Sequence, residues 1–251
     1  MKTTDKMISA GDEELAHCTA GYWQQFMRYF ADLGYETHAI NLPGRAKSSL
    51  KKGHINKYGA EDCCLCLKQT VEKIFPRPII IAHSLDGYLT LKYLESNELP
   101  GVVLIVSYPH TGASRLIFRM FRRHPLKFLR TMISSNLHIP DAKTVWELFF
   151  SDPPPVDPEQ YYRKQCVPDS KKMGMDMLFR VHLYPEKVTT PCLVMIGERD
   201  LTYSVKEQQG LAEALGADFM VLPGQAHNVM LEAGWQQTAY AIHRWIVTKT
   251  A

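Results

Sequence analysis

A serine with the surroundings of a nucleophile follows the most apolar run of the chain. Ser84 comes after Ile79–Ala82 and His83, and a helix is predicted to begin near Gly87. A serine on such a tight strand-to-helix turn projects at the carboxyl end of a sheet, where helix-terminal amide groups can stabilise an oxyanion. Because serine is a poor nucleophile by itself, this chemistry also requires a base and an orienting acid.

Two later strands are followed by suitable partners for this serine. Asp200 ends the segment Gly-Glu-Arg-Asp after one strand, and His227 ends Gly-Gln-Ala-His after the next. The carboxyl ends of parallel strands share one edge of a sheet, so these side chains are expected to meet near Ser84. The chain order serine, acid, histidine is that of a known hydrolytic triad. On the residues alone, Glu198 is an alternative acid.

The elements that would position these side chains alternate between helix and strand. This alternation, with a strand apolar on both faces, predicts an α/β fold with a doubly wound, mostly parallel sheet. The expected strands are residues 36–42, 79–82, 102–107, 192–196 and 219–222. The expected helices are residues 21–33, 58–75, 87–96, 205–215 and 235–247.

One long segment interrupts the alternation. Residues 109–190 are helical in pattern and rich in proline, without a buried-strand signal. We interpret them as a helical cap inserted after the strand that ends at Ser107, so that residues 1–108 and 191–251 form the core. An insertion of this kind disfavours a closed barrel.

Five segments together resemble the α/β-hydrolase superfamily, in particular its cap-bearing esterase and lysophospholipase-like branch. They are Gly21-Tyr-Trp-Gln-Gln-Phe, Gly34-Tyr-Glu-Thr-His-Ala-Ile-Asn-Leu-Pro-Gly44, Ala82-His-Ser-Leu-Asp-Gly87, Gly197-Glu-Arg-Asp200 and Gly224-Gln-Ala-His227-Asn-Val-Met-Leu-Glu232. The resemblance implies that Ser84 is the nucleophile, Asp200 the orienting acid and His227 the general base. It also implies that the amide of Leu85 is one oxyanion donor.

The sequence departs from this family at the nucleophile turn. The family has glycine two residues on either side of the serine, because strand and helix pack closely there. Here the two positions are Ala82 and Asp86. The helix dipole favours a carboxylate at position 86, but Asp86 could also crowd the oxyanion region, repel anionic substrates or hydrogen-bond into the site.

A second departure concerns the N-terminal region. The family begins with a strand hairpin, and this chain has only 20 residues before the first expected helix, so we expect a reduced strand set. Residues 6–10 are expected to form the strand that precedes the oxyanion loop. Gly11 or Asp12 would then supply the second oxyanion donor. The alternative places Glu13 and Glu14 at that point.

Several aromatic and histidine side chains are candidates for the substrate pocket. An aromatic and Met-rich cap suits an apolar or acyl-bearing small molecule, although core packing would give the same pattern. The candidates outside the triad are His83, Asp86, His110, Trp146, Phe149 and Phe150.

Charge and cysteine patterns limit the possible partners. Residues 115–130 hold six Lys or Arg and no acid, so the rest of the chain carries −3 against a total of +3, which argues against nucleic-acid binding. This stretch is expected to be a packed amphipathic cap helix, the alternative being a surface for an anionic head group or lipid. No apolar run reaches membrane-spanning length. The six cysteines show no disulfide spacing, and without an export signal a cytoplasmic location is expected.

These observations predict a serine hydrolase acting on a carboxylic ester of a fairly apolar small molecule. No Gly-rich phosphate loop or metal motif occurs, so no cofactor and no metal are expected. A homodimer is compatible with an open sheet edge. The alternatives are acid–base chemistry without hydrolysis, as in a lyase or cyclase, and a ligand-binding protein with an impaired site.

Overall fold

Six parallel strands form a single sheet in the computed structural model, which describes residues 6–9, 23–40, 42–43, 53–136, 138–139, 141–151, 156–166, 169–179 and 182–249. The strand order is β2-β1-β3-β4-β5-β6. The strands are β1 (Lys6–Ser9), β2 (Glu36–Ala39), β3 (Ile79–His83), β4 (Val102–Ile105), β5 (Cys192–Gly197) and β6 (Asp218–Leu222). The predicted doubly wound α/β sheet is confirmed.

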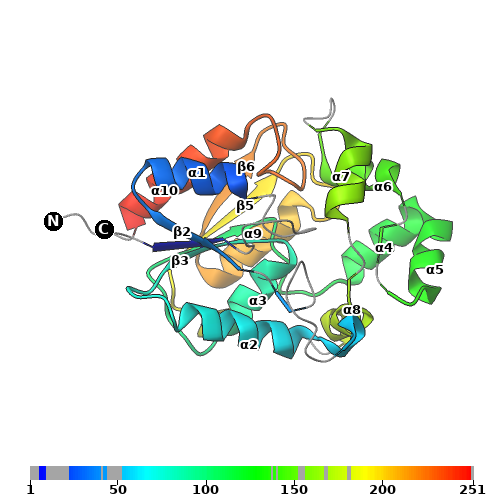
Figure 1. Cartoon of the computed structure of the whole chain (residues 1–251), viewed down its shortest axis with the longest axis horizontal. Coiled ribbons are helices and arrows are strands. Elements are labelled where there is room, and N and C mark those ends of the chain that lie inside the picture. The colour runs from blue at the N-terminus through cyan, green and yellow to red at the C-terminus, as the bar shows by residue number, and fades with distance from the viewer. Residues whose placement is uncertain are drawn as a thin grey trace.

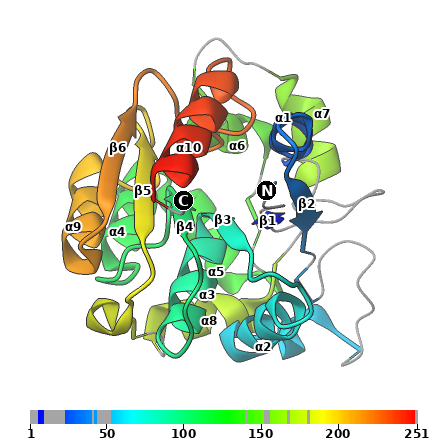
Figure 2. The same cartoon turned by 90° about the vertical axis from the view of Figure 1, so that its left-hand side faces the viewer.

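Helices cover both faces of this sheet. Figures 1 and 2 show α1 and α10 on one face, and α2 and α3 on the other. The helices of the core are α1 (Gln24–Asp32), α2 (Ala60–Val71), α3 (Leu85–Leu94), α9 (Val205–Leu215) and α10 (Trp235–Lys249), with short 3-10 turns η1 (Ile55–Lys57) and η2 (Pro185–Lys187). None of the helices in the described part of the chain is both long and apolar enough to cross a bilayer.

Continuous apolar runs become the central strands because both faces of the sheet are covered. All four residues of β4 are fully buried, as are the side chains of β5. In α1, Phe26 and Phe30 face the core, and Gly34 after the helix has φ of 93°, a conformation that glycine adopts without strain. The expected strand 102–107 is shorter than predicted: β4 ends at Ile105, and Val106 turns away with φ of 47°.

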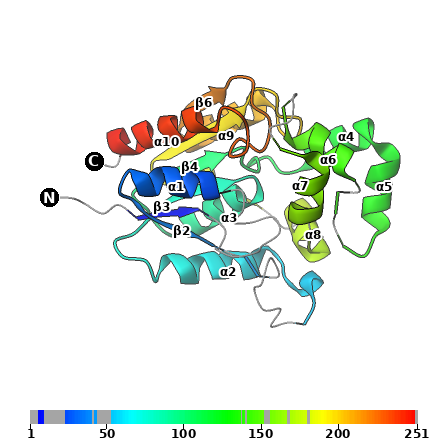
Figure 3. The ribbon, with the colours of Figure 1, turned by 45° about the horizontal axis from the view of Figure 1, so that its top comes forward.

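The described part of the segment between β4 and β5 contains five α-helices, in addition to η2. Figures 1 and 3 show them together at one end of the molecule, away from both termini. They are α4 (Ser114–Arg123), α5 (Pro125–Ile133), α6 (Ala142–Phe149), α7 (Pro158–Gln165) and α8 (Lys171–Phe179). Val145, Phe150 and Tyr161 form a small core of their own there. That residues 109–190 act as a cap over the site stays a prediction.

Buried polar contacts attach this helical segment to the core. The carboxylate of Asp176 on α8 accepts a hydrogen bond from the amide of Ala60 at 3.1 Å, where it satisfies a free amide at the start of α2. On the other side, the buried carboxylate of Glu232 accepts the amide hydrogen bonds of Ser151 at 2.8 Å and Ala226 at 3.2 Å. The loop that carries His227 is therefore held by the helical segment as well as by the sheet.

Candidate active site

Ser84 occupies a strained turn between β3 and α3. Its backbone has φ of 53° and ψ of −117°, in the region that disfavours residues with a Cβ, at a cost of roughly 1–3 kcal/mol. Three hydrogen bonds hold the conformation: the Ser84 amide donates to the Ile105 carbonyl (3.0 Å), and the amides of Gly87 (3.1 Å) and Tyr108 (3.0 Å) donate to the Ser84 carbonyl. The turn presents Ser84 at the carboxyl edge of the sheet, with Leu85 beginning α3.

The close contact between α3 and the sheet falls at Gly87. A Cβ at this position would lie 2.1 Å from the Oγ and 2.7 Å from the Cβ of Ser107, which is fully buried after β4. Asp86 instead lines a cavity of about 20 Å3 with apolar residues of β3, α2 and α3. The close contact of α3 with Ser107 thus falls at Gly87, the residue after Asp86.

We predict that Gly87→Ala will impair both stability and activity. The added methyl group must displace the start of α3, which we expect to cost about 1–3 kcal/mol in the free energy of unfolding. The same shift moves Ser84 and the Leu85 amide, so activity should fall by roughly 100-fold. Denaturant unfolding and steady-state kinetics on a chromogenic ester measure the two effects.

A matched control is available in α9. Gly210 lies in mid-helix, and a Cβ there would meet no atom within 4 Å. Gly210→Ala should leave activity unchanged and stabilise the chain by about 0.5–1 kcal/mol. Equal effects of the two substitutions would contradict the role given to Gly87.

Asp200 and His227 form a buried hydrogen-bonded pair. The Asp200 Oδ2 lies 2.8 Å from His227 Nδ1, and the two side chains are 0% and 5% exposed. The other carboxylate oxygen, Oδ1, accepts from the amides of Thr202 (2.5 Å) and Tyr203 (2.9 Å) and from the Thr202 hydroxyl (2.6 Å). Burial alone would raise the pKa of Asp200, but His227 and these hydrogen bonds outweigh burial and lower it. Asp200 is therefore held as a carboxylate facing the imidazole.

The loops after β5 and β6 meet because Gly197 allows it. A Cβ on Gly197 would lie 2.2 Å from the Ala226 carbonyl oxygen and 2.5 Å from that of Gln225. The amide of Arg199 donates to the Gln225 carbonyl at 2.8 Å. The carboxylate of Glu198, the alternative acid, accepts a hydrogen bond from the Gly224 amide at 2.8 Å. It therefore binds the turn that precedes His227, and the His227 imidazole is bound by Asp200.

His83 and Phe149 enclose the imidazole of His227. The ring centroids of His83 and Phe149 lie 4.8 Å and 5.0 Å from that of His227, and Phe149 is nearly parallel to it. His83 Nε2 donates to the His227 carbonyl oxygen at 3.0 Å. Burial, reinforced by His227, lowers the pKa of His83 to about 3. His83 is thus a neutral hydrogen-bond donor that fixes the backbone of His227.

The lowered pKa of His83 predicts a pH-dependent stability. In the unfolded chain His83 is protonated below pH 6.5, whereas in the folded chain it stays neutral down to about pH 3. Wild type should therefore lose about 1.4 kcal/mol of unfolding free energy per pH unit, relative to His83→Gln, as pH falls through this window. Glutamine keeps a donor but cannot titrate. Urea unfolding of wild type and of His83→Gln at each pH gives the difference in their unfolding free energies. Titratable groups that the two proteins share, Asp200 among them, cancel in this difference. A difference that stays constant with pH would contradict the prediction.

The other predicted pocket residues are placed differently. Phe150 is 6% exposed and stacks on Trp146 (5.1 Å) and against Tyr161 (4.8 Å), inside the small core of the helical segment. His110 lies in the turn after β4, where burial lowers its pKa. Gly11 and Asp12, and the alternative Glu13 and Glu14, lie outside the described residues. Of the five predicted pocket side chains other than Asp86, His83 and Phe149 are the ones in ring contact with His227.

Two neighbours of Asp200 were not identified from the sequence. The Thr202 Oγ1 lies 2.7 Å from His227 Nδ1 in addition to its bond to Asp200. Tyr203 is 5% exposed; burial raises its pKa, and a hydrogen-bonding interaction with the Ser84 side chain opposes this rise. The Tyr203 ring centroid lies 6.1 Å from that of His227, so Tyr203 neighbours the histidine as well as Ser84. The sequence feature that could have identified Thr202 and Tyr203 is their position, two and three residues after Asp200.

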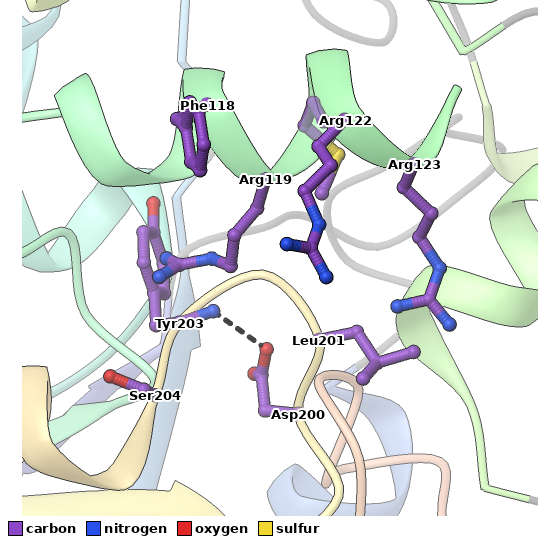
Figure 4. A pocket seen from close by; sticks show the side chains of 9 residues that line it. Phe118, Arg119, Arg122, Arg123, Asp200, Leu201, Tyr203 and Ser204 are labelled. Atoms are coloured by element: carbon purple, nitrogen blue, oxygen red, sulfur yellow. Dashed lines mark hydrogen bonds between the residues drawn. The ribbon is translucent and has the colours of Figure 1, made fainter. Parts of the chain in front are cut away.

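A cavity of about 620 Å3 separates this loop from α4. Figure 4 shows arginines of α4 above the loop 200–204. Arg119 reaches across to the Thr202 carbonyl (3.1 Å) and to the buried Glu207 (2.8 Å), while Arg123 pairs with Glu147 at 2.6 Å. Helix α4 is thereby anchored to the loop of the candidate acid. Among the described residues, no three metal-ligating side chains cluster.

Comparisons with known proteins agree with this architecture. The family model described as serine aminopeptidase, S33, matches residues 16–234. No curated protein matches the sequence. Among solved structures, the Paleococcus ferrophilus monoacylglycerol lipase is similar, with 21% identity, a TM-score of 0.70 and coverage of 97% of this chain and 94% of that one.

Two further structures extend the comparison. Polyneuridine aldehyde esterase has 13% identity and a TM-score of 0.73, covering 97% of this chain and 99% of its own. Tomato methylketone synthase I, complexed with 2-tridecanone, has 13% identity and a TM-score of 0.71, covering 99% and 100%. At these identities the likeness shows the fold alone, which is that of the α/β-hydrolases.

Proposed function

Because the chain belongs to the serine aminopeptidase S33 family of α/β-hydrolases, we propose that it is a serine hydrolase cleaving a carboxylic ester of a fairly apolar small molecule. The observation that carries this proposal is the buried pair of Asp200 and His227 at 2.8 Å, which follows strands of the same parallel sheet as the serine in its strained strand-to-helix turn. A buried carboxylate is costly unless it is paired, and here it is aimed at an imidazole.

In the proposed reaction each side chain has a distinct role. Since Asp200 occupies His227 Nδ1, the Nε2 atom is left to accept the proton of the Ser84 hydroxyl as its oxygen attacks the acyl carbon. The Leu85 amide, at the start of α3, would donate to the oxyanion. His227 then gives the proton to the leaving alcohol, and a water molecule, activated by His227, releases the acid and restores Ser84.

Apolar surroundings support an apolar substrate. Phe149 covers one face of His227, and Tyr203 lies beside it. A further cavity of about 200 Å3 lies among helices of the insertion, with Phe128, Ile139 and Leu148 in its lining. Apolar pockets with a few convergent polar groups are typical of small-molecule sites.

An active-site probe tests the proposal directly. A fluorophosphonate reacts with an activated serine, so it should label wild type and leave Ser84→Ala unlabelled. Denatured wild type is the control for nonspecific reaction. A folded wild-type chain that does not react with the probe would overturn the proposal.

A further inference from the structure

The helix pair α4–α5 exposes apolar side chains that no part of the described chain covers. Leu126 and Ile133 are 81% and 83% exposed, Phe118 is 64% exposed, and Leu129 is half-exposed. Positions 126, 129, 130 and 133 lie on one face of α5, because residues three, four and seven apart are neighbours on a helix. Solitary exposed apolar residues are ordinary, but a contiguous group of them marks an interaction surface.

Basic residues are interleaved with this apolar group. Neither helix contains an acidic residue. Arg115, Arg122 and Arg130 are exposed and have no ion-pair partner among the described residues. Arg119 and Arg123 of α4 are paired with Glu207 and Glu147, and Phe118 and Arg122 line the cavity above the loop 200–204. Arg115 and the exposed face of α5 therefore present uncompensated positive charge together with aliphatic side chains.

We propose that this α4–α5 surface, formed by Arg115, Leu126, Leu129, Arg130 and Ile133, docks on an anionic lipid surface. Helices with apolar and basic residues on one exposed face lie in the membrane interface, where apolar side chains enter the acyl boundary and arginines contact the head groups. Helices α4 and α5 stand at the end of the molecule away from both termini, so they can approach a flat surface first (Figures 1 and 3).

Charge complementarity favours lipid over other partners. A second copy of this chain would bring two uncompensated positive surfaces together, which is repulsive. Nucleic acid would match the charge, but the most exposed side chains are aliphatic, and single strands are bound by stacking on aromatic rings. Anionic lipid satisfies both the arginines and the aliphatic side chains.

Vesicle sedimentation tests this inference without any ester hydrolysis. The Ser84→Ala chain should pellet with vesicles of phosphatidylcholine containing about one-third phosphatidylglycerol, and much less with pure phosphatidylcholine. Added salt should weaken the binding because it screens the arginines. Since Ser84→Ala lacks the candidate nucleophile, the result is independent of the proposed reaction.

Matched variants locate the contact. Leu126→Asn with Ile133→Asn should lower vesicle partitioning roughly 100-fold or more, because each buried aliphatic side chain accounts for about 10-fold or more. Arg115→Ser and Arg130→Ser together should remove the preference for anionic lipid, at about 5-fold per arginine.

The control pair is also exposed, although less so than Leu126 and Ile133, and lies outside the insertion. Leu65 on α2 and Val247 on α10 are 54% and 53% exposed, and their replacement by Asn should leave partitioning within about 2-fold of the parent. The inference is overturned if the parent chain stays in the supernatant with both vesicles, or if the α4–α5 pair and the control pair have equal effects. A dimer that dissociates on the α4–α5 substitutions, without vesicle binding, would equally overturn it in favour of self-association.

Discussion

Ester hydrolysis by the Ser84→Ala chain should fall by roughly 10⁵- to 10⁶-fold in kcat, because no other group can form the acyl intermediate. Ser84 is held at φ of 53° by three backbone hydrogen bonds, and alanine accepts the same backbone at similar cost. The variant should therefore fold as wild type does, and substrate affinity should change little. Steady-state kinetics with a series of acyl esters measures the loss.

The double variant sharpens this prediction. Residues that act as one catalytic unit are not additive, so Ser84→Ala with His227→Ala should be no slower than Ser84→Ala alone. Acid–base chemistry without a covalent intermediate gives the opposite pattern, in which Ser84→Ala retains activity and His227→Ala abolishes it. That outcome would contradict the proposed hydrolysis and favour a lyase or cyclase.

The Asp200→Asn chain should lose about 10⁴-fold in kcat with little change in KM. Asp200 accepts the Nδ1 proton of His227 at 2.8 Å, which leaves Nε2 free to take the serine proton. An asparagine amide can donate to Nδ1 instead, and the proton would then reside on Nε2, where it blocks the general base. Because the substitution changes the tautomer of His227 and not the substrate pocket, the loss of activity should appear in kcat. A chain that keeps a tenth of its activity would contradict the role of Asp200.

A substitution at Thr202 should cause a smaller loss of activity than the substitution at Asp200. Its hydroxyl donates to Asp200 Oδ1 (2.6 Å), so its oxygen can accept part of the His227 Nδ1–H bond at 2.7 Å. Thr202→Val preserves the shape and leaves two amides on the carboxylate, so we expect a loss of only about 10-fold. A loss as large as that of Asp200→Asn would mean that Thr202, and not Asp200, holds the imidazole.

The sheet and the segments that contain the three candidate triad residues followed from local pattern. Apolar runs covered on both faces predicted β3, β4 and β5, and parallel strands bring their carboxyl ends to one edge. The segments containing Ser84, Asp200 and His227 were therefore predictable from their position after strands. The close approach at Gly87 was not, because it depends on how near Ser107 lies after the next strand.

Residues of the same type can have different roles that become visible only in the folded chain. Phe149 and Phe150 are adjacent and identical, yet Phe149 lies against His227, whereas Phe150 is buried against Trp146 and Tyr161. Successive residues at the end of a helix point in different directions, and the docking of α6 determines which of them meets the site. Sequence alone predicted both as pocket residues with equal weight.

Local pattern was enough to predict the fold class and the order of the core elements, because periodicity is a local property. It also proposed Ser84, His227 and one of two acids as the candidate triad, and the family resemblance selected Asp200 over Glu198. Other features depended on how the chain folds: Thr202 lies beside the imidazole, Arg119 is anchored to the loop of Asp200, and Leu126 and Ile133 remain uncovered. The hydrogen bonds among these features join residues up to 83 positions apart in the sequence. The exposure of Leu126 and Ile133 depends on whether another part of the chain packs against α5. An amphipathic basic helix has the same pattern whether its apolar side chains face a core or a lipid surface.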